Sequence, residues 1–207
     1  YEKDDLVSAL LEDNSARRKR QKDLDIRVIV GNPPYSVGQG DANANNANVP
    51  YPSLDERIRT TYAARSEANN KNALYDSYIR SIRWASDRIG NAGIIGFVTN
   101  AGFVEANTAD GLRKCLVDEF SSLYVFHLRG NQRTSGETSR KEGGKIFGSG
   151  SRAPIAISLL VKNPKAEAHG QIHFHDIGDY LSREEKLEKI VSYASVAGIP
   201  DWQHVVP

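Results

Sequence analysis

One stretch, residues 28–35, constrains the fold of this chain more than any other. It reads VIVGNPPY, so a β-branched run leads directly into a polar turn that contains two prolines. A short apolar run of this kind predicts a strand that is covered on both faces, as in a parallel sheet. In open α/β sheets, ligands bind beyond the carboxyl ends of the strands. The turn at residues 32–35 is therefore the first candidate for a functional site.

The chemistry of this turn favours binding. Neither Pro33 nor Pro34 has a backbone N–H, and each proline holds the residue before it in an extended conformation. The backbone carbonyl groups are therefore free to accept hydrogen bonds from another molecule. Asn32 adds a side-chain acceptor, and Tyr35 adds an aromatic ring. The alternative interpretation is an ordinary turn that closes a strand, with Tyr35 packed in the core.

At residues 32–35 the sequence resembles the DNA adenine-N6 methyltransferases, which use S-adenosylmethionine and carry this tetrapeptide after a hydrophobic strand. The resemblance implies a catalytic turn made of Asn32, Pro33, Pro34 and Tyr35. The Asn32 side chain and the Pro33 carbonyl would accept hydrogen bonds from the exocyclic amine of a flipped adenine, and Tyr35 would stack on the base. Over residues 26–163 the chain looks most like the methyltransferase segment of large single-chain restriction-modification enzymes, which also carry helicase and nuclease parts.

These residue types suit the methylation of an amine. The lone pair of the adenine amine is delocalised into the ring, so acceptors that gather its two hydrogens favour the attacking geometry and the developing positive charge. Unpairing a base costs a few kcal/mol, and stacking on an aromatic ring returns about 1–3 kcal/mol per base. The ring of Tyr35 could therefore offset much of the cost of extruding the base.

Further residues are candidates for the same site. Asn100 and Phe103 follow the strand expected at residues 94–99, and the resemblance places the end of that strand beside the target base. Phe147 matches a residue that stacks on the other face of the adenine in the resembled family. A plain turn at Asn100 and Phe103, and a core anchor at Phe147, are the alternatives. The connection at residues 129–152 is expected to be a flexible loop with cations for DNA phosphates: Arg133, Arg140, Lys141 and Lys145.

The cofactor side of the reaction is not evident in the sequence. The resembled family has a Gly-rich turn after its first strand, and nothing before Val28 supplies one. The chain contains no methionine and starts abruptly at Tyr1. We therefore expect a segment of a longer polypeptide, inactive by itself, with its S-adenosylmethionine site mostly upstream. The expected partners are double-stranded DNA and the other domains of that polypeptide, including the cofactor half and a target-recognition domain.

Composition narrows the remaining classes. The chain has 27 Lys and Arg residues against 26 Asp and Glu residues, a formal net charge of +1, so any attraction to DNA must come from local patches. A single Cys115, no secretory signal and no membrane-spanning apolar run favour a cytoplasmic setting. No metal site is expected, because His173 and His175 alternate on a strand without a third ligand, a pattern that predicts an exposed polar face.

The order of elements predicts an α/β fold. Helical patterns alternate with apolar runs, and the expected helices lie at residues 3–22, 73–89 and 108–120. A capping box at residues 182–185 opens a last helix, with a buried face expected at Leu187, Ile190, Val191 and Ala194. We expect the C-terminal, substrate-side half of a Rossmann-like methyltransferase sheet at residues 26–163. A helix and linker at residues 1–25 would precede it, and a small αβ appendage and linker at residues 164–207 would follow.

Other functions fit the same tetrapeptide. It can hold any planar amine, so methylation of a protein glutamine amide or of an RNA base is an alternative. A non-catalytic DNA-binding or coupling module is an alternative of another class. The long basic connection favours a nucleic acid over a peptide as the substrate.

Overall fold

The computed structural model describes residues 12–35, 49–148 and 152–206. Its middle layer is one six-stranded sheet with the strand order β1-β2-β4-β3-β5-β6. The strands are β1 (Val28–Gly31), β2 (Gly93–Asn100), β3 (Ser122–Arg129), β4 (Ile155–Lys162), β5 (Gln171–Asp176) and β6 (Gln203–Val205). The mixed α/β class predicted from the sequence is confirmed.

The directions of the strands determine which loops meet. β1 is parallel to β2, and β3 is parallel to β5, whereas β4 is antiparallel to both β2 and β3. β1, β2, β3 and β5 therefore all point the same way, and β6 runs against β5. The segments that follow β1, β2 and β3 and the segment that precedes β4 all lie at one edge of the sheet, which we call the carboxyl edge.

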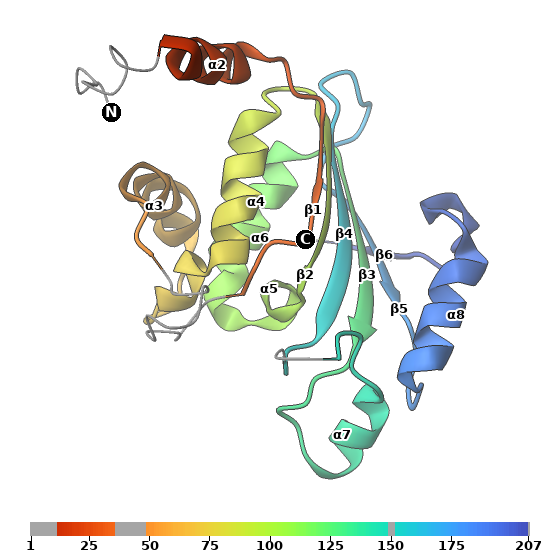
Figure 1. Cartoon of the computed structure of the whole chain (residues 1–207). Helices are drawn as coiled ribbons and strands as arrows, with labels where there is room; N and C mark the ends of the chain where they lie inside the picture. Colours follow the sequence, from red (N-terminus) through yellow and green to blue (C-terminus); the bar gives the residue numbers. More distant parts are fainter. Residues whose placement is uncertain (1–11, 36–48, 149–151, 207) are drawn as a thin grey trace.

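Helices cover the two faces of the sheet unequally (Figure 1). α4 and α6 lie on one face with α3 outside α4, α8 lies on the other face, and α7 lies at the carboxyl edge. None of the described helices is both long and apolar enough to cross a membrane. The α-helices are α2 (Glu12–Asp23), α3 (Pro52–Ile58), α4 (Ser77–Arg88), α5 (Gly102–Glu105), α6 (Asp110–Glu119), α7 (Gly136–Glu142) and α8 (Arg183–Tyr193). Short π or 3-10 turns are η1 (Arg59–Ala63), η2 (Asn72–Tyr75), η3 (Asn107–Ala109) and η4 (Val196–Gly198).

The helix expected at residues 73–89 is confirmed from Ser77 onward. Its apolar stripe, which includes Tyr78 and Ile82, is buried in the main core of the chain. The first turn differs from the prediction, because Asp76 is extended (φ −65°, ψ 144°) and separates η2 from α4. Gly111 of α6 allows close packing in the same layer, since a Cβ atom there would lie 2.0 Å from the Tyr62 carbonyl oxygen.

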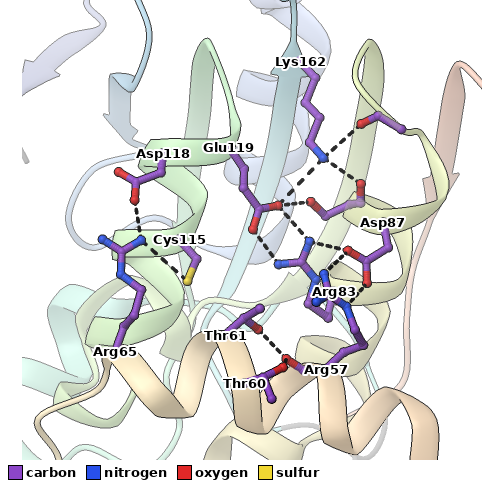
Figure 2. A network of polar contacts seen from close by, with 12 residues as sticks. Arg57, Thr60, Thr61, Arg65, Arg83, Asp87, Cys115, Asp118, Glu119 and Lys162 are labelled. Atoms are coloured by element: carbon purple, nitrogen blue, oxygen red, sulfur yellow. Dashed lines mark hydrogen bonds and ion pairs between the residues drawn. The ribbon is translucent and has the colours of Figure 1, made fainter.

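A buried polar network ties the helices of this layer to the sheet (Figure 2). Arg83 of α4 is only 2% exposed, and its guanidinium group donates two hydrogen bonds to Glu119 of α6, at 2.6 and 2.8 Å, and one to Asp87, at 2.7 Å. Arg57 of α3 reaches Asp87 from outside, at 2.8 and 2.9 Å. Lys162 of β4 donates to the Ser86 carbonyl at 2.7 Å. Three helices and one strand are therefore joined around one buried guanidinium group.

The prediction that the first strand is covered on both faces is wrong for the described chain. β1 is an edge strand, and its side chains Val28 and Val30 are 60% and 79% exposed. Ile94 pairs with Val28 across the parallel ladder and is 37% exposed. Ile29 of β1 packs against the main core, so the exposed face with Val28 and Val30 is the part of β1 whose apolar character is not explained by burial within the described residues.

Three local predictions also need correction. The connection at residues 129–152 is not all loop, because it contains α7. His175 is 3% exposed and contacts the Tyr193 hydroxyl group at 3.2 Å, and His173 stacks on Tyr124, so they do not form an exposed polar face. The buried face expected for the last helix does not include Val191 of α8, which is 76% exposed, or Ala194, which directly follows α8 and is also exposed. The first part of the helix expected at residues 3–22 lies outside the described residues, and α2 forms its remainder.

Candidate functional site

The carboxyl edge brings the candidate residues together. The turn at residues 32–35 directly follows β1, and Asn100 is the last residue of the neighbouring parallel strand β2. α7 and Phe147 belong to the connection from β3 to β4, which leaves and re-enters the sheet at this same edge. Three segments that are far apart in the sequence, the tetrapeptide among them, therefore lie at the same edge of the sheet, as the strand directions require.

Within the tetrapeptide, exposure alternates. Asn32 and Pro34 are exposed, and Pro33 is buried. The amide group of Asn32 is thus presented to solvent at the end of β1, while Pro33 fixes the turn against the protein. A side-chain acceptor in this position is available to a ligand at the carboxyl edge.

Tyr35 is half-buried and packs edge-on against Tyr78 of α4, with the ring centroids 6.0 Å apart and the planes at 89°. Its hydroxyl oxygen is buried and has no hydrogen-bond partner among the described residues. Burial, with a smaller contribution from the charge of Asp76, raises the pKa of Tyr35 to about 12. The phenol is therefore neutral at physiological pH. Because the hydroxyl oxygen is buried, the ring is the part of this side chain that a ligand could contact.

Asn100 and Phe103 have different surroundings. The Asn100 side-chain oxygen accepts a hydrogen bond from the Gly102 backbone N–H at 2.8 Å and thereby shapes the turn between β2 and α5. Phe103 is 4% exposed and lies 6.5 Å from Tyr78, measured between ring centroids. Tyr35, Tyr78 and Phe103 thus form a row of aromatic rings that continues from the tetrapeptide into the core, with Phe103 at its buried end.

Phe147 is half-buried at the border of a second apolar cluster, which we call the carboxyl-edge cluster. Tyr35 borders the same cluster. The two rings that the sequence assigned to opposite faces of a bound base therefore pack around one set of apolar side chains. The buried members of the carboxyl-edge cluster are Phe126, Leu128, Ile146, Ile155, Ile177 and Ile199.

The four cations predicted to contact phosphates lie on or beside α7, and acidic groups lie close to two of them. Arg133 and Arg140 are exposed, and Lys145 is half-buried. Arg140 lies 3.5 Å from a Glu137 carboxylate oxygen. Lys141 lies 3.8 Å from a carboxylate oxygen of Asp179, which belongs to the segment between β5 and α8. The acids of this distant segment could not be assigned to the basic connection from its local sequence.

Sequence reasoning missed two contributors at this edge. Tyr78 was assigned only to a buried stripe, yet it supports the Tyr35 ring. The start of α8 contacts the segment before Phe147, and Arg183 donates to the Ile146 carbonyl oxygen at 2.9 Å. The helical periodicity of α4 placed Tyr78 in the core, whereas no local signal connected Arg183 with residues 142–147. In the described part of the chain, no group of three or more His, Cys, Asp or Glu side chains could hold a metal ion.

Comparison with solved structures gives strong matches to large DNA-bound enzymes. The nuclease-deletion mutant of the Type ISP restriction-modification enzyme LlaGI, solved with a DNA substrate mimic, has a TM-score of 0.90 at 50% identity, over 99% of this chain and 16% of that one. The ATP-dependent Type ISP enzyme LlaBIII bound to DNA has a TM-score of 0.86 at 41% identity, over 94% and 13%. The DrdV–DNA complex has a TM-score of 0.85 at 37% identity, over 96% and 19%. The chain therefore spans less than a fifth of each of these proteins.

Comparison with curated proteins gives no match. Among protein families, the model of the Eco57I restriction-modification methylase matches residues 4–133. This range is more than half of the chain and contains the tetrapeptide, β1, β2 and β3. The chain belongs to the Eco57I restriction-modification methylase family.

Proposed function

We propose that this chain is the substrate-side half of a DNA adenine-N6 methyltransferase within a restriction-modification enzyme. The observation that carries the proposal is the exposed Asn32 at the carboxyl end of β1, beside the half-buried ring of Tyr35. The position agrees with the general location of ligands in α/β sheets. Family membership supports methyl transfer, and the matched LlaGI, LlaBIII and DrdV structures contain DNA or its mimic.

In this proposal the chain's own residues bind and orient the amine. The Asn32 side-chain oxygen and the Pro33 carbonyl accept the two N6 hydrogens, so the nitrogen lone pair is directed away from the ring toward the methyl donor. The ring of Tyr35 contacts one face of the adenine, and Phe147 contacts the other. Asn100 shapes the neighbouring turn, and Phe103 supports the aromatic row from the core.

S-adenosylmethionine supplies the methyl group in the proposed reaction, but the described residues do not fit a complete site for it. The first glycine of the sequence is Gly31, and α2 occupies the chain before β1, so no Gly-rich turn after a strand is present there. No residue of this chain is assigned to the cofactor. We propose instead that another part of a longer polypeptide holds it.

The exposed edge of the sheet supports that division. A strand edge beside exposed valines is prone to association, because its backbone groups can pair with another strand and its apolar side chains contact water. We propose that β1, with Val28 and Val30, packs against the cofactor half of the same polypeptide. Double-stranded DNA would then meet the carboxyl edge, where Arg133, Arg140, Lys141 and Lys145 can contact phosphates.

The test is the substitution Asn32→Ala in the longer polypeptide. Loss of one acceptor of the N6 hydrogens is expected to lower methyl transfer to an adenine-containing duplex by about 100-fold or more, by analogy with the loss of other transition-state hydrogen bonds. Binding of the duplex, measured by fluorescence anisotropy, should change little. Asn91→Ala is the matched control, because Asn91 is exposed at the opposite end of β2.

Three results would contradict the proposal. Unchanged methylation by Asn32→Ala would remove this residue from the reaction. Methylation of RNA or of a glutamine-containing peptide in preference to the duplex would select the alternative substrates. Binding of DNA without any methyl transfer by the unmodified polypeptide would indicate a coupling module.

A further inference from the structure

The segment that ends at Phe147 is held in place by the start of α8. This anchored segment, residues 142–147, joins α7 to the proposed second ring of the adenine site. Its Gly144 backbone N–H donates to the Leu181 carbonyl oxygen at 2.9 Å, just before α8. Ile146 is buried in the carboxyl-edge cluster. The part of the chain beyond residue 163 therefore contacts the segment that precedes Phe147.

Two glycines make this close approach possible. A Cβ atom at Gly143 would lie 2.1 Å from the Leu181 carbonyl oxygen, and one at Gly144 would lie 2.4 Å from the Arg183 backbone nitrogen. Gly143 also has φ +66°, a conformation that favours glycine. Backbone therefore packs directly on backbone, and no side chain separates the anchored segment from the start of α8.

Lys186 is the strongest link between the two segments. It is 0% exposed, and its Nζ atom donates hydrogen bonds of 2.7 Å to the carbonyl oxygens of both Glu142 and Gly144. Burying an ammonium group is costly unless it is compensated by hydrogen bonds or charges. Glu142 and Asp176 supply nearby negative charge, whereas Arg129 opposes it. A residue that is this costly to bury, placed on the carbonyls that lead to Phe147, indicates a constraint on that segment.

Arg183 extends the same anchoring by one residue. Its Nε atom donates to the Ile146 carbonyl oxygen at 2.9 Å, next to Phe147. Together, Lys186 and Arg183 engage the carbonyls of residues 142, 144 and 146. Three fixed carbonyls within five residues define the path of the backbone up to the aromatic ring.

We propose that Lys186 and Arg183 are positioning residues of the adenine site, which hold the backbone of residues 142–147 so that Phe147 faces the flipped base. The inference rests on the proposed function, since it assigns Phe147 to base stacking. The inference assigns a positioning role in the adenine site to the αβ region after residue 163. Displacement of a reacting group by about 1 Å can lower a rate by about 100-fold, so anchoring of this kind has a measurable effect.

The test uses Lys186→Met in the longer polypeptide, with Lys189→Met as the matched control. Lys189 lies on the same helix and donates to the Ile177 carbonyl oxygen at 2.7 Å, outside the anchored segment. Lys186→Met is expected to lower kcat for duplex methylation by about 10- to 100-fold, whereas Lys189→Met should leave it near the unmodified value. Lys186→Arg should restore part of the activity, because it keeps a buried donor.

A double-mutant cycle with Phe147→Ala separates positioning from general destabilisation. If Lys186 acts through Phe147, the double variant should lose no more activity than Phe147→Ala alone. The fluorescence of 2-aminopurine at the target position should show reduced base flipping in Lys186→Met. Multiplicative losses, or unchanged kcat and fluorescence in Lys186→Met, would overturn the inference.

Arg183→Gln provides an independent variant if Lys186→Met does not fold. The Arg183 side chain is 48% exposed, so the protein should tolerate its replacement. Arg183→Gln should show the same non-multiplicative behaviour with Phe147→Ala, and multiplicative losses here would also overturn the inference.

Asn32→Ala distinguishes the two proposals. If Asn32→Ala abolishes methylation and Lys186→Met leaves methylation unchanged, only the positioning role fails. If Asn32→Ala remains active, the proposed function itself is refuted.

Discussion

Removal of the Glu119 carboxylate should open the helical layer locally, because it leaves the Arg83 guanidinium group buried without its main partner. Glu119 accepts two of the three hydrogen bonds that Arg83 donates to carboxylates in this network. Breaking a buried ion pair by deleting one partner costs about 3–5 kcal/mol. Asp87 still accepts one hydrogen bond at 2.7 Å, so we expect Glu119→Ala to cost about 3 kcal/mol, the lower end of this range.

The comparison within the same network is Arg57→Ala. Arg57 also pairs with Asp87, but its side chain is 50% exposed and the carboxylate is 36% exposed, so water and salt screen the interaction. Pairs of this kind contribute at most about 1 kcal/mol. The Arg83–Glu119 and Arg57–Asp87 pairs look similar in Figure 2. Their contributions to the free energy of unfolding are nevertheless expected to differ about threefold.

Hydrogen–deuterium exchange of the longer polypeptide measures this difference locally, without requiring the whole protein to unfold in two states. A loss of about 3 kcal/mol corresponds to about 100-fold faster exchange through local opening of α4 and α6. Arg57→Ala should accelerate exchange there by less than about tenfold. Equal effects of Arg57→Ala and Glu119→Ala, or no effect of Glu119→Ala, would refute the reasoning from burial.

Two further predictions concern pH and salt. His127 of β3 is 5% exposed, and burial lowers its pKa below the ordinary 6.5 despite the nearby Asp176 carboxylate. As the pH falls, the unfolded state therefore binds a proton before the folded state does, so stability should fall below pH 6.5. Faster hydrogen exchange in β3 should report this loss of stability. His127→Gln should reduce the pH-dependent loss, whereas His204→Gln, at an exposed position, should not. Joint neutralisation of Arg133, Arg140 and Lys141 should flatten the dependence of DNA affinity on salt concentration. Arg133→Gln alone should lower the slope of log affinity against log salt by about 1. Arg140→Gln should lower the slope by less, because Glu137 lies beside Arg140. An unaltered slope in the triple variant would contradict a phosphate contact.

The elements that the sequence predicts well are those whose own residues determine them. β2, β3 and β4 follow apolar runs, and the capping box of α8 is formed as expected, with Ser182 accepting from the Glu185 backbone N–H and Glu185 accepting in return. The turn at residues 32–35 lies at a strand end because β1 forms where the β-branched run predicts it. Local composition was sufficient in each case.

The features that the sequence does not predict depend on distant partners. α7 has no buried residues, so no apolar periodicity marks it, and contacts with residues 180–186 hold it in place. The buried residue of α8 is Lys186 rather than an apolar side chain, because the helix faces carbonyl oxygens of another segment. The 79% exposure of Val30 likewise does not follow from its apolar side chain or from the β-branched run around it. Neither hydrophobic patterning nor local charge contains this information.

The bare edge of β1 also affects how this region can be handled in the laboratory. In the described part of the chain β1 has a neighbouring strand on one side only, and such an open edge beside exposed valines is a template for intermolecular pairing. Expression of this region alone is therefore expected to give oligomers or insoluble material. A charged residue at Val30, the more exposed position at 79%, should improve the solubility of the isolated region and lower the stability of the longer polypeptide. Opposite effects of this substitution on the isolated region and on the longer polypeptide would distinguish an aggregation-prone surface from an interface inside the longer polypeptide.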